Sequence, residues 1–143
     1  MQEQVAMNRA VVEFDSVDGN LGFARVAAAS FAAQLDFTVD ELEDIKLAVS
    51  EAVSNCIVHA YPNAIGRVRM SLESSHGHFA LEIEDWGTGI ADIAEARLPG
   101  RTTCPERIGM GFTLMEALSL HLEVESELGR GTRVRMAFAP DQA

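Results

Sequence analysis

Three side chains that could do chemistry together occupy one row of a predicted helix. In the stretch SEAVSNCIVHAY (residues 50–61), Glu51, Asn55 and His59 are spaced four residues apart, so they line up along one side of the helix. The apolar stripe beside this row consists of Ala52, Val53, Cys56, Ile57 and Ala60. Polar groups at the edge of such a stripe are half-buried and need partners. The row predicts either a local hydrogen-bonded edge or a site in which Asn55 ligates Mg²⁺ and Glu51 activates a nucleophile.

A second candidate is the stretch DWGTGI (residues 85–90), which directly follows an apolar strand pattern. Asp85, at the end of the strand, can accept a hydrogen bond from an exocyclic amine, and Gly87 and Gly89 let the backbone turn tightly beside a flat ligand. For a nucleotide this arrangement favours adenine, because guanine presents a carbonyl oxygen to the same carboxylate. A plain glycine turn is the alternative interpretation of the same residues.

A third candidate is the stretch IGMGFT (residues 108–113), where a predicted loop meets a predicted helix. Gly109 and Gly111 leave the backbone amides of the helix start open to an anion, and Arg107 can add charge at the far phosphate. The chain has one lysine, Lys46, and no GxxxxGK[ST] loop, so a nucleotide must be held in another way. Structural glycines at the start of a helix are the alternative.

The periodicity of the chain predicts the elements that position these residues. The predicted strands cover residues 5–14, 67–75, 78–85, 121–127 and 132–138. The predicted helices cover 20–35, 39–60, 91–96 and 111–119, with 97–110 as a mobile loop. Thr38 and Glu41 form a capping box that opens the second helix. Hairpin-connected strands with grouped helices indicate an α+β fold, a two-layer α/β sandwich with helices on one face of the sheet.

The amino-acid composition restricts the class of protein to which this chain can belong. The 143 residues are 48% hydrophobic and 23% charged, which predicts a single globular domain over 1–143. No apolar run reaches about 18 residues, and the start lacks a basic segment followed by an apolar one, so we expect a cytoplasmic protein that is neither secreted nor in a membrane. Cys56 and Cys104 fit no metal-ligand spacing and predict reduced thiols.

The charge of the chain indicates its partners. A net charge of −11 argues against direct binding to nucleic acid and suits a basic protein partner. The predicted helix at 20–35 has Arg25 as its only charged residue, although a surface helix normally shows several. We expect this helix to form part of a dimer or partner-binding face with Arg25 as a polar anchor. Alternatively, its alanines pack inside the monomer and Arg25 is simply exposed.

Taken together, the three candidates resemble a known family. Glu51 and Asn55, then DxGxG, then GxG at a helix start occur in the order found in the ATP-binding domain shared by gyrase, Hsp90, histidine kinases and MutL. Within that superfamily the chain resembles the serine-kinase anti-sigma factors, most closely the sporulation branch. The resemblance covers nearly the whole chain and rests on FARVAAASFAAQLD (23–36), DELEDIKLAVSEAVSNCIVHAY (40–61), IEDWGTGI (83–90), TTCPERIGMGFTLMEAL (102–118) and VESELGRGT (124–132).

The resemblance implies a Bergerat-type fold with a mixed, mostly antiparallel sheet, and it implies a role for each site residue. Asn55 is implied to be the Mg²⁺ ligand, and Glu51 the general base toward a serine hydroxyl or water. Asp85 is implied to bind the adenine amino group. The other ATP-binding positions implied are Gly87, Gly89, Thr102, Thr103, Arg107, Gly109, Gly111 and Thr132, with both Thr102 and Thr103 in a lid and Thr132 at the adenine end.

The resemblance also implies an activity and partners. Proteins of this kind are dimers that bind an RNA polymerase sigma factor and, with Mg-ATP, phosphorylate a serine on an anti-anti-sigma protein. Three alternatives stay open: a stress-response anti-sigma kinase, a non-catalytic ATP- or ADP-gated binding module, and the catalytic domain of a histidine kinase. The last needs a phosphoacceptor histidine on a long dimerisation helix pair, and nothing before residue 40 supplies one.

Overall fold

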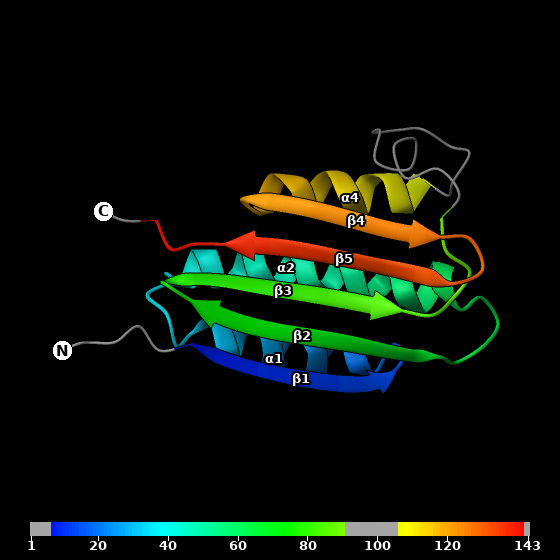
Figure 1. The fold of residues 1–143 in the computed structure, drawn as a ribbon, viewed down its shortest axis with the longest axis horizontal. Coiled ribbons are helices and arrows are strands. Elements are labelled where there is room, and N and C mark those ends of the chain that lie inside the picture. Colours follow the sequence, from blue (N-terminus) through cyan, green and yellow to red (C-terminus); the bar gives the residue numbers. More distant parts are fainter. Residues whose placement is uncertain (1–6, 91–105, 142–143) are drawn as a thin grey trace.

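The computed structural model describes residues 7–90 and 106–141, and for 106–110 it describes the backbone alone. The described strands form one antiparallel sheet in the order β1-β2-β3-β5-β4 (Figure 1). They span Asn8–Asp15 (β1), Arg67–Ser75 (β2), His78–Asp85 (β3), His121–Glu127 (β4) and Gly131–Phe138 (β5). Every pairing between these strands is antiparallel, so the mixed pairing that the resemblance implied does not occur among them.

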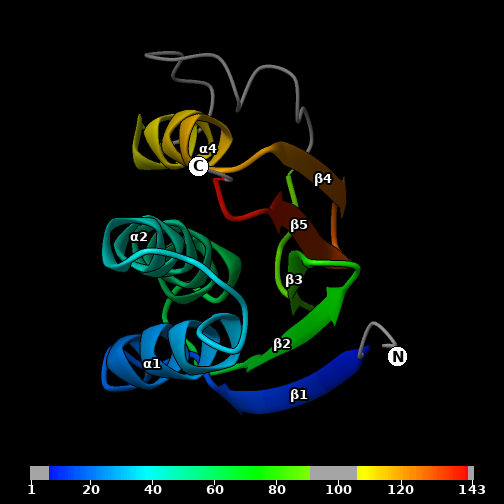
Figure 2. The ribbon, with the colours of Figure 1, turned by 90° about the vertical axis from the view of Figure 1, so that its left-hand side faces the viewer.

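The described helices lie together on one face of this sheet, as Figure 2 shows. They are α1 (Asn20–Ala32), α2 (Val39–Asn55) and α4 (Glu106–Leu118), and a π-helical turn, η1 (Cys56–Ala60), extends α2. This arrangement confirms the predicted α+β sandwich. No helix in the described ranges is both long and apolar enough to span a bilayer.

The core lies between the helices and the inner face of the sheet. Strand β2 alternates buried and half-buried residues, with Val68, Met70 and Leu72 facing the helices, as expected for a sheet covered on one side. Helix α2 begins as the capping box predicts: the Thr38 hydroxyl accepts from the Glu41 amide at 3.1 Å, and the Thr38 amide donates to Glu41 Oε1 at 2.8 Å. Local capping and strand alternation therefore position α2 over the sheet.

The outer face of the sheet carries a row of alternating charges that crosses all the strands. Glu13, Arg69, Glu84, Arg133 and Glu125 are successive cross-strand partners. Nitrogen–oxygen distances along the row are 2.8, 3.8, 3.5 and 3.1 Å. Opposite charges in directly opposed positions stabilise the strand register, and they leave the helix-covered face as the apolar one.

Several predicted boundaries are wrong: β1 begins at Asn8 and ends at Asp15 instead of covering 5–14, and the start of β5 and the end of α4 differ by one residue each. Helix α1 ends at Ala32 instead of residue 35, and α4 begins at Glu106 instead of residue 111, so residues 106–110 are helical and not part of a loop. The two glycines of the third candidate therefore lie inside the first turns of α4. Glycine lowers helix propensity, but Phe112 and Met115 of this helix are fully buried, and such packing outweighs local propensity. The predicted helix at 91–96 lies outside the described residues.

Candidate functional site

The polar row on α2 is half-buried, as predicted for Glu51 and Asn55, and the row continues to His59 in the π-helical turn. Helix α4 crosses this row at Gly111. A Cβ atom added to Gly111 would lie 3.2 Å from Glu51 Oε1 and 3.5 Å from Asn55 Nδ2. The absence of a side chain thus lets the two helices approach at the polar row, which brings Gly111, Glu51 and Asn55 together.

The Asn55 amide is the group that most clearly lacks a partner. Within the described part of the chain, its Nδ2 is the one buried side-chain nitrogen or oxygen without a hydrogen bond. A buried polar atom without a partner costs free energy unless a ligand or water satisfies it. An amide can present its oxygen or its nitrogen by rotation, so this side chain can offer an oxygen to a cation.

These residues fit a Mg²⁺ ion of the kind that shares its coordination with phosphate. No group of three or more His, Cys, Asp or Glu side chains in the described residues is arranged to hold a metal. Magnesium commonly takes one or two protein oxygens and completes its octahedron with water and phosphate oxygens. Asn55 could supply such an oxygen, with the carboxylate of Glu51 one helical turn away.

Asp85 lies at the end of β3 and is 5% exposed. Its Oδ1 accepts from the Gly87 amide at 2.9 Å and from the Thr132 amide at 3.3 Å, and its Oδ2 accepts from the Cys56 thiol at 3.4 Å. Burial raises the pKa of this carboxyl above the usual aspartate value, and the three donors oppose that rise. The site therefore provides an oriented, buried carboxylate of the kind that can recognise an amine.

The DWGTGI turn is attached to the end of the polar-row helix. The Thr88 amide donates to the Ala60 carbonyl at 3.0 Å, and the Thr88 hydroxyl donates to the His59 carbonyl at 3.1 Å. A Cβ at Gly87 would collide with the same Ala60 carbonyl, and Gly89 has a φ of +77°. Both glycines are thus required by the backbone, and the turn and the helix end form one unit.

Strand β5 completes the site from the other side. Thr132 is the cross-strand partner of Asp85, and its hydroxyl lies 2.8 Å from the hydroxyl of Ser126. The Ser126 hydroxyl also accepts from the Ile90 amide at 2.7 Å. Thr132 therefore lies directly beside Asp85.

Some predicted residues are not placed in this site. Thr102 and Thr103 lie outside the described residues, and the side chain of Arg107 is not described, although Arg107 and Gly109 belong to α4. Arg25 lies on α1, where its Nη1 donates to the Ser50 hydroxyl at 3.2 Å. Arg25 is thus part of a separate surface.

Sequence reasoning missed three residues that contact the site. Cys56 looked like part of the apolar stripe, yet its thiol points at Asp85. Tyr61 accepts from the Trp86 amide at 2.7 Å and donates to the Arg67 carbonyl at 2.8 Å, and Ser126 ties the turn to β5. Of these three residues, only Cys56 could have been suspected from the sequence, because it directly follows the candidate residue Asn55.

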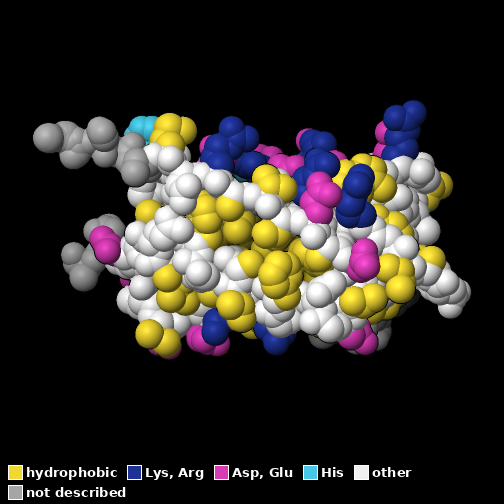
Figure 3. Space-filling model, turned by 90° about the horizontal axis from the view of Figure 1, so that it is seen from below, with side chains coloured by type: hydrophobic (Ala, Val, Ile, Leu, Met, Phe, Trp, Pro, Cys, Tyr) yellow, Lys and Arg dark blue, Asp and Glu magenta, His cyan; other side chains and the backbone are white. Residues whose placement is uncertain are grey.

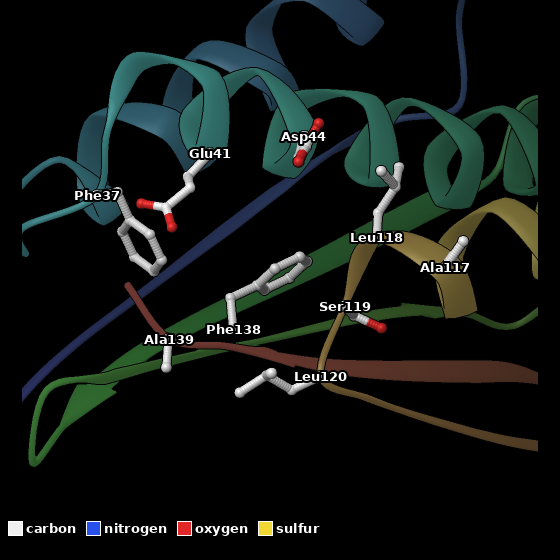
Figure 4. Close-up of a pocket in the computed structure, with 9 residues that line it drawn as sticks. All are labelled: Phe37, Glu41, Asp44, Ala117, Leu118, Ser119, Leu120, Phe138 and Ala139. Atoms are coloured by element: carbon white, nitrogen blue, oxygen red, sulfur yellow. The ribbon is translucent and has the colours of Figure 1, made fainter. Parts of the chain in front are cut away.

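A hollow of about 250 Å³ lies at the other end of α2 (Figure 4). It is lined by Phe37, Glu41, Asp44, Ala117, Leu118, Ser119, Leu120, Phe138 and Ala139. None of these residues belongs to the predicted site, so the two regions are distinct.

An antiparallel sheet with its helices on one face, and a buried aspartate beside a polar helix row, is the arrangement of a nucleotide-binding ATPase domain. The sequence pattern of the histidine kinase-like ATPase domain matches residues 15–138. The fold is similar to a crystal structure of the RsbU and RsbW domains of a Mycobacterium tuberculosis protein. The TM-score is 0.66 at 17% identity, over 92% of this chain and 32% of that one.

Curated relatives specify the family further. The chain is 50% identical over 132 residues to the anti-sigma F factor of Clostridium botulinum (strain Eklund 17B / Type B), covering 90% of this chain and 92% of the relative. It is 49% identical over 131 residues to the anti-sigma F factor of Thermoanaerobacter sp. (strain X514), with the same coverage. The chain belongs to the anti-sigma F factor family of histidine kinase-like ATPase domains.

Proposed function

We propose that this protein is an anti-sigma factor that binds and inhibits an RNA polymerase sigma factor. With Mg-ATP, it also phosphorylates a serine on an anti-anti-sigma protein and so controls sporulation transcription. The observation that carries the catalytic part is the buried amide nitrogen of Asn55, which has no hydrogen-bond partner and lies with Glu51 against Gly111. The names of the relatives support the sigma-factor part. This function belongs in the cytoplasm, where RNA polymerase acts.

The adenine end of ATP binds at Asp85. The carboxylate accepts the exocyclic amine, and the amides of Gly87 and Thr132 hold the carboxylate in place through Oδ1. Gly87 and Gly89 bring the backbone of the turn close to the flat base. The hydroxyl of Thr132, held by Ser126, supports the same end.

The phosphate end of ATP binds near the polar row. Asn55 offers its amide oxygen to a Mg²⁺ ion, which, when bound, offsets the negative charge of the phosphates. Gly111 leaves α4 without a side chain where it meets the row, and Gly109, two residues earlier in this helix, is proposed to border the phosphates. Thr102 and Thr103, which precede α4 in the sequence, and Arg107, in the first turn of α4, are also proposed to contact the phosphates.

Glu51 acts as the general base. It accepts the proton of the substrate serine hydroxyl as the serine oxygen forms a bond to the γ-phosphorus of ATP and the bond from that phosphorus to the bridging oxygen breaks. ADP and the phosphoserine are the products. Gly111 keeps the carboxylate close to Asn55, since a methyl group there would press on Glu51 Oε1.

The partner-binding face is proposed to be the outer side of α1. Phe23 and Val26 of α1 are 48% and 65% exposed and flank Arg25 in the sequence, and Leu47 of the neighbouring α2 is 43% exposed. Figure 3 views the molecule from the side of β1 and α1 and shows apolar side chains gathered over its centre, with charged ones mainly along the upper edge and fewer along the lower edge. An apolar patch of this kind marks an interaction surface, and we assign it to a homodimer or sigma-factor contact.

The nucleotide part is tested by calorimetric titration with ADP and ATP, with and without Mg²⁺. We expect micromolar, magnesium-dependent binding that Asn55→Ala and Asp85→Asn both weaken. Glu51→Gln serves as the matched variant, because it keeps the size of the side chain and loses only the base: it should bind nucleotide and fail to transfer phosphate to the anti-anti-sigma protein. Wild-type protein that binds neither nucleotide would contradict the kinase assignment.

Two alternatives give different results in these assays. A non-catalytic ATP- or ADP-gated module binds nucleotide but transfers no phosphate even as wild type. A stress-response kinase transfers phosphate to a different anti-anti-sigma protein. The partner face is tested separately by Arg25→Glu, which should weaken sigma-factor binding or dimerisation and leave ADP affinity unchanged. An unchanged partner affinity and an unchanged dimer would refute the role of Arg25.

A further inference from the structure

Cys56 makes a contact that neither metal binding nor phosphate transfer explains. It opens the π-helical turn after Asn55 and is 3% exposed. Its Sγ lies 3.4 Å from Asp85 Oδ2 and 3.5 Å from the Ala52 carbonyl. The Ala52 carbonyl already accepts the backbone amide of Cys56, and a carboxylate is the stronger acceptor. The single thiol proton is therefore directed to Asp85.

The chemistry of this thiol is that of a hydrogen-bond donor and not of a nucleophile. Burial, and then the nearby charge of Asp85, raise the pKa of the Cys56 thiol well above its usual value. A buried cysteine in such surroundings is inert to oxidation and exchange, because the thiolate is the reactive form. What remains for Cys56 is to donate its proton to Asp85.

Counting acceptor positions shows what this donation does. A carboxylate has about four lone-pair positions, two on each oxygen. The amides of Gly87 and Thr132 both point to Oδ1, and the Cys56 thiol points to Oδ2. One position on Oδ2 is left, which matches the single N–H that an exocyclic amine directs along its Watson–Crick edge.

We propose that Cys56 is a positioning residue for adenine recognition: its thiol orients Asp85 so that one acceptor position on Oδ2 faces the exocyclic amine of the base. This inference rests on the proposed nucleotide site. It extends that proposal by explaining why the site would prefer adenine to guanine. A carboxyl group that gains a proton can donate to the carbonyl oxygen of guanine, and the Cys56 donor helps to keep Asp85 ionised.

The test compares Cys56→Ala with Cys56→Ser, using ADP and GDP as probes. Loss of one donor to a buried carboxylate should lower ADP affinity about five- to tenfold at neutral pH. The loss should also reduce the preference for ADP over GDP. It should raise the pH below which ADP affinity falls, which we call the acid limb of ADP binding. Cys56→Ser keeps a donor and should restore all three properties toward wild type.

Val53→Ala is the control for simple loss of packing. Val53 is fully buried on the same helix, three residues before Cys56, and its side chain has no hydrogen-bonding group. It should lower stability without moving the acid limb of ADP binding. A second measurement, on folded wild-type protein, is the infrared S–H stretch of Cys56, assigned by its loss in Cys56→Ser. Asp85→Asn should shift this band.

The outcomes separate the two proposals. If wild-type protein binds ADP, while Cys56→Ala matches Val53→Ala in acid limb and nucleotide preference, the positioning role is refuted and the nucleotide site stands. If Cys56→Ala does not fold, an S–H band that Asp85→Asn leaves unmoved refutes the role equally. If wild-type protein binds neither ADP nor ATP, both proposals fail.

Discussion

Asp85 combines burial with a set of hydrogen-bond donors that favour its charged form. Burial alone raises the pKa of the carboxyl, and the donors Gly87, Cys56 and Thr132 counteract part of that rise. The result is a carboxylate whose orientation is determined by its donors and whose protonation responds to small changes around it. At the scale of single residues, this balance decides both the affinity and the base preference of the proposed nucleotide site.

Asp85→Asn should lower the affinity for ADP without lowering the stability of the fold. The asparagine oxygen can still accept from the Gly87 and Thr132 amides. Its NH₂ group, however, is a hydrogen-bond donor and would face the amine of adenine, which is also a donor. We expect ADP affinity to fall about 10- to 100-fold by calorimetry. The free energy of unfolding in urea should stay equal or rise, because a buried charge is removed. If Asp85→Asn binds ADP as tightly as the wild type, Asp85 does not contact the nucleotide.

The raised pKa of Asp85 also predicts how ADP binding depends on pH. Binding needs the ionised form, so affinity should fall as pH drops through the folded-state pKa, which lies above that of an ordinary aspartate. The native state holds this proton to higher pH than the unfolded chain, so the contribution of Asp85 to stability decreases as pH rises through that interval. Titrations across pH should show this acid limb in the wild type and not in Asp85→Asn.

At the scale of elements, the end of α2 links the two halves of the site. The helix winds into a π-helical turn at Cys56–Ala60, and π-turns inside helices often occur at functional sites. The carbonyls of His59 and Ala60 in this turn accept from Thr88 of the glycine turn. The glycine turn, where we propose that adenine binds, and the polar row are therefore held in one relative position by hydrogen bonds from Thr88 to these two carbonyls.

Gly111→Ala tests how closely α4 must approach α2. The new methyl group would lie 3.2 Å from Glu51 Oε1, so the flexible carboxylate must move by a few tenths of an ångström. Alanine is about 1 kcal/mol better than glycine in a helix interior, so the free energy of unfolding should be unchanged or higher. Phosphate transfer should fall about tenfold, as expected for a displaced general base.

Gly22→Ala on α1 is the matched control for that experiment. An added Cβ there meets nothing closer than the Arg25 guanidinium at 3.9 Å, so it should raise the unfolding free energy in the same way and leave the rate of phosphate transfer unchanged. Equal transfer rates in Gly111→Ala and wild type would show that the position of Glu51 against α4 is irrelevant to the reaction.

At the scale of the whole molecule, two faces of the fold have different chemistry. The outer face of the sheet is covered by Arg–Glu pairs such as Arg133–Glu125 and Arg69–Glu13. The helix side carries exposed apolar residues around Arg25. With a net charge of −11, the molecule as a whole favours basic partners, and the exposed apolar residues of α1 form the partner-binding face that we propose.

Mg-ADP should stabilise the whole protein. A ligand present at about 100 times its Kd adds about 2.7 kcal/mol to the free energy of unfolding, which corresponds to a rise in Tm of about 8 °C for a chain of this size. Chelation of Mg²⁺ should reduce the rise, and Asp85→Asn should reduce it to about half or less at the same ADP concentration. A Tm that does not respond to ADP at any concentration would speak against a nucleotide site in the folded protein.

The overall charge predicts the salt dependence of partner binding. Long-range attraction between this acidic chain and a basic sigma factor speeds their encounter and is screened by salt. We expect the association rate to fall at least tenfold between about 50 mM and 500 mM NaCl, with little change in the dissociation rate. Surface plasmon resonance measures both rates. A salt-independent association rate would exclude electrostatic steering.

Local patterns determined much of this structure. Strands β2 and β3 have the bounds predicted from the sequence, because alternation reports directly which face of a strand is buried. The capping box predicted the first residue of α2, and the helix period predicted that Glu51 and Asn55 are half-buried. In each case the cause lies within a few residues of the effect.

Tertiary structure alone decided the contacts that make a site of these residues. Cys56 lies 29 residues from Asp85 and Thr132 lies 47 residues from it, and no local pattern indicates that either would donate to its carboxylate. The early start of α4 likewise depends on burying Phe112 and Met115, against the preference of two glycines. Contacts of this range depend on strand order and register, which the packing of the whole chain selects among locally similar alternatives.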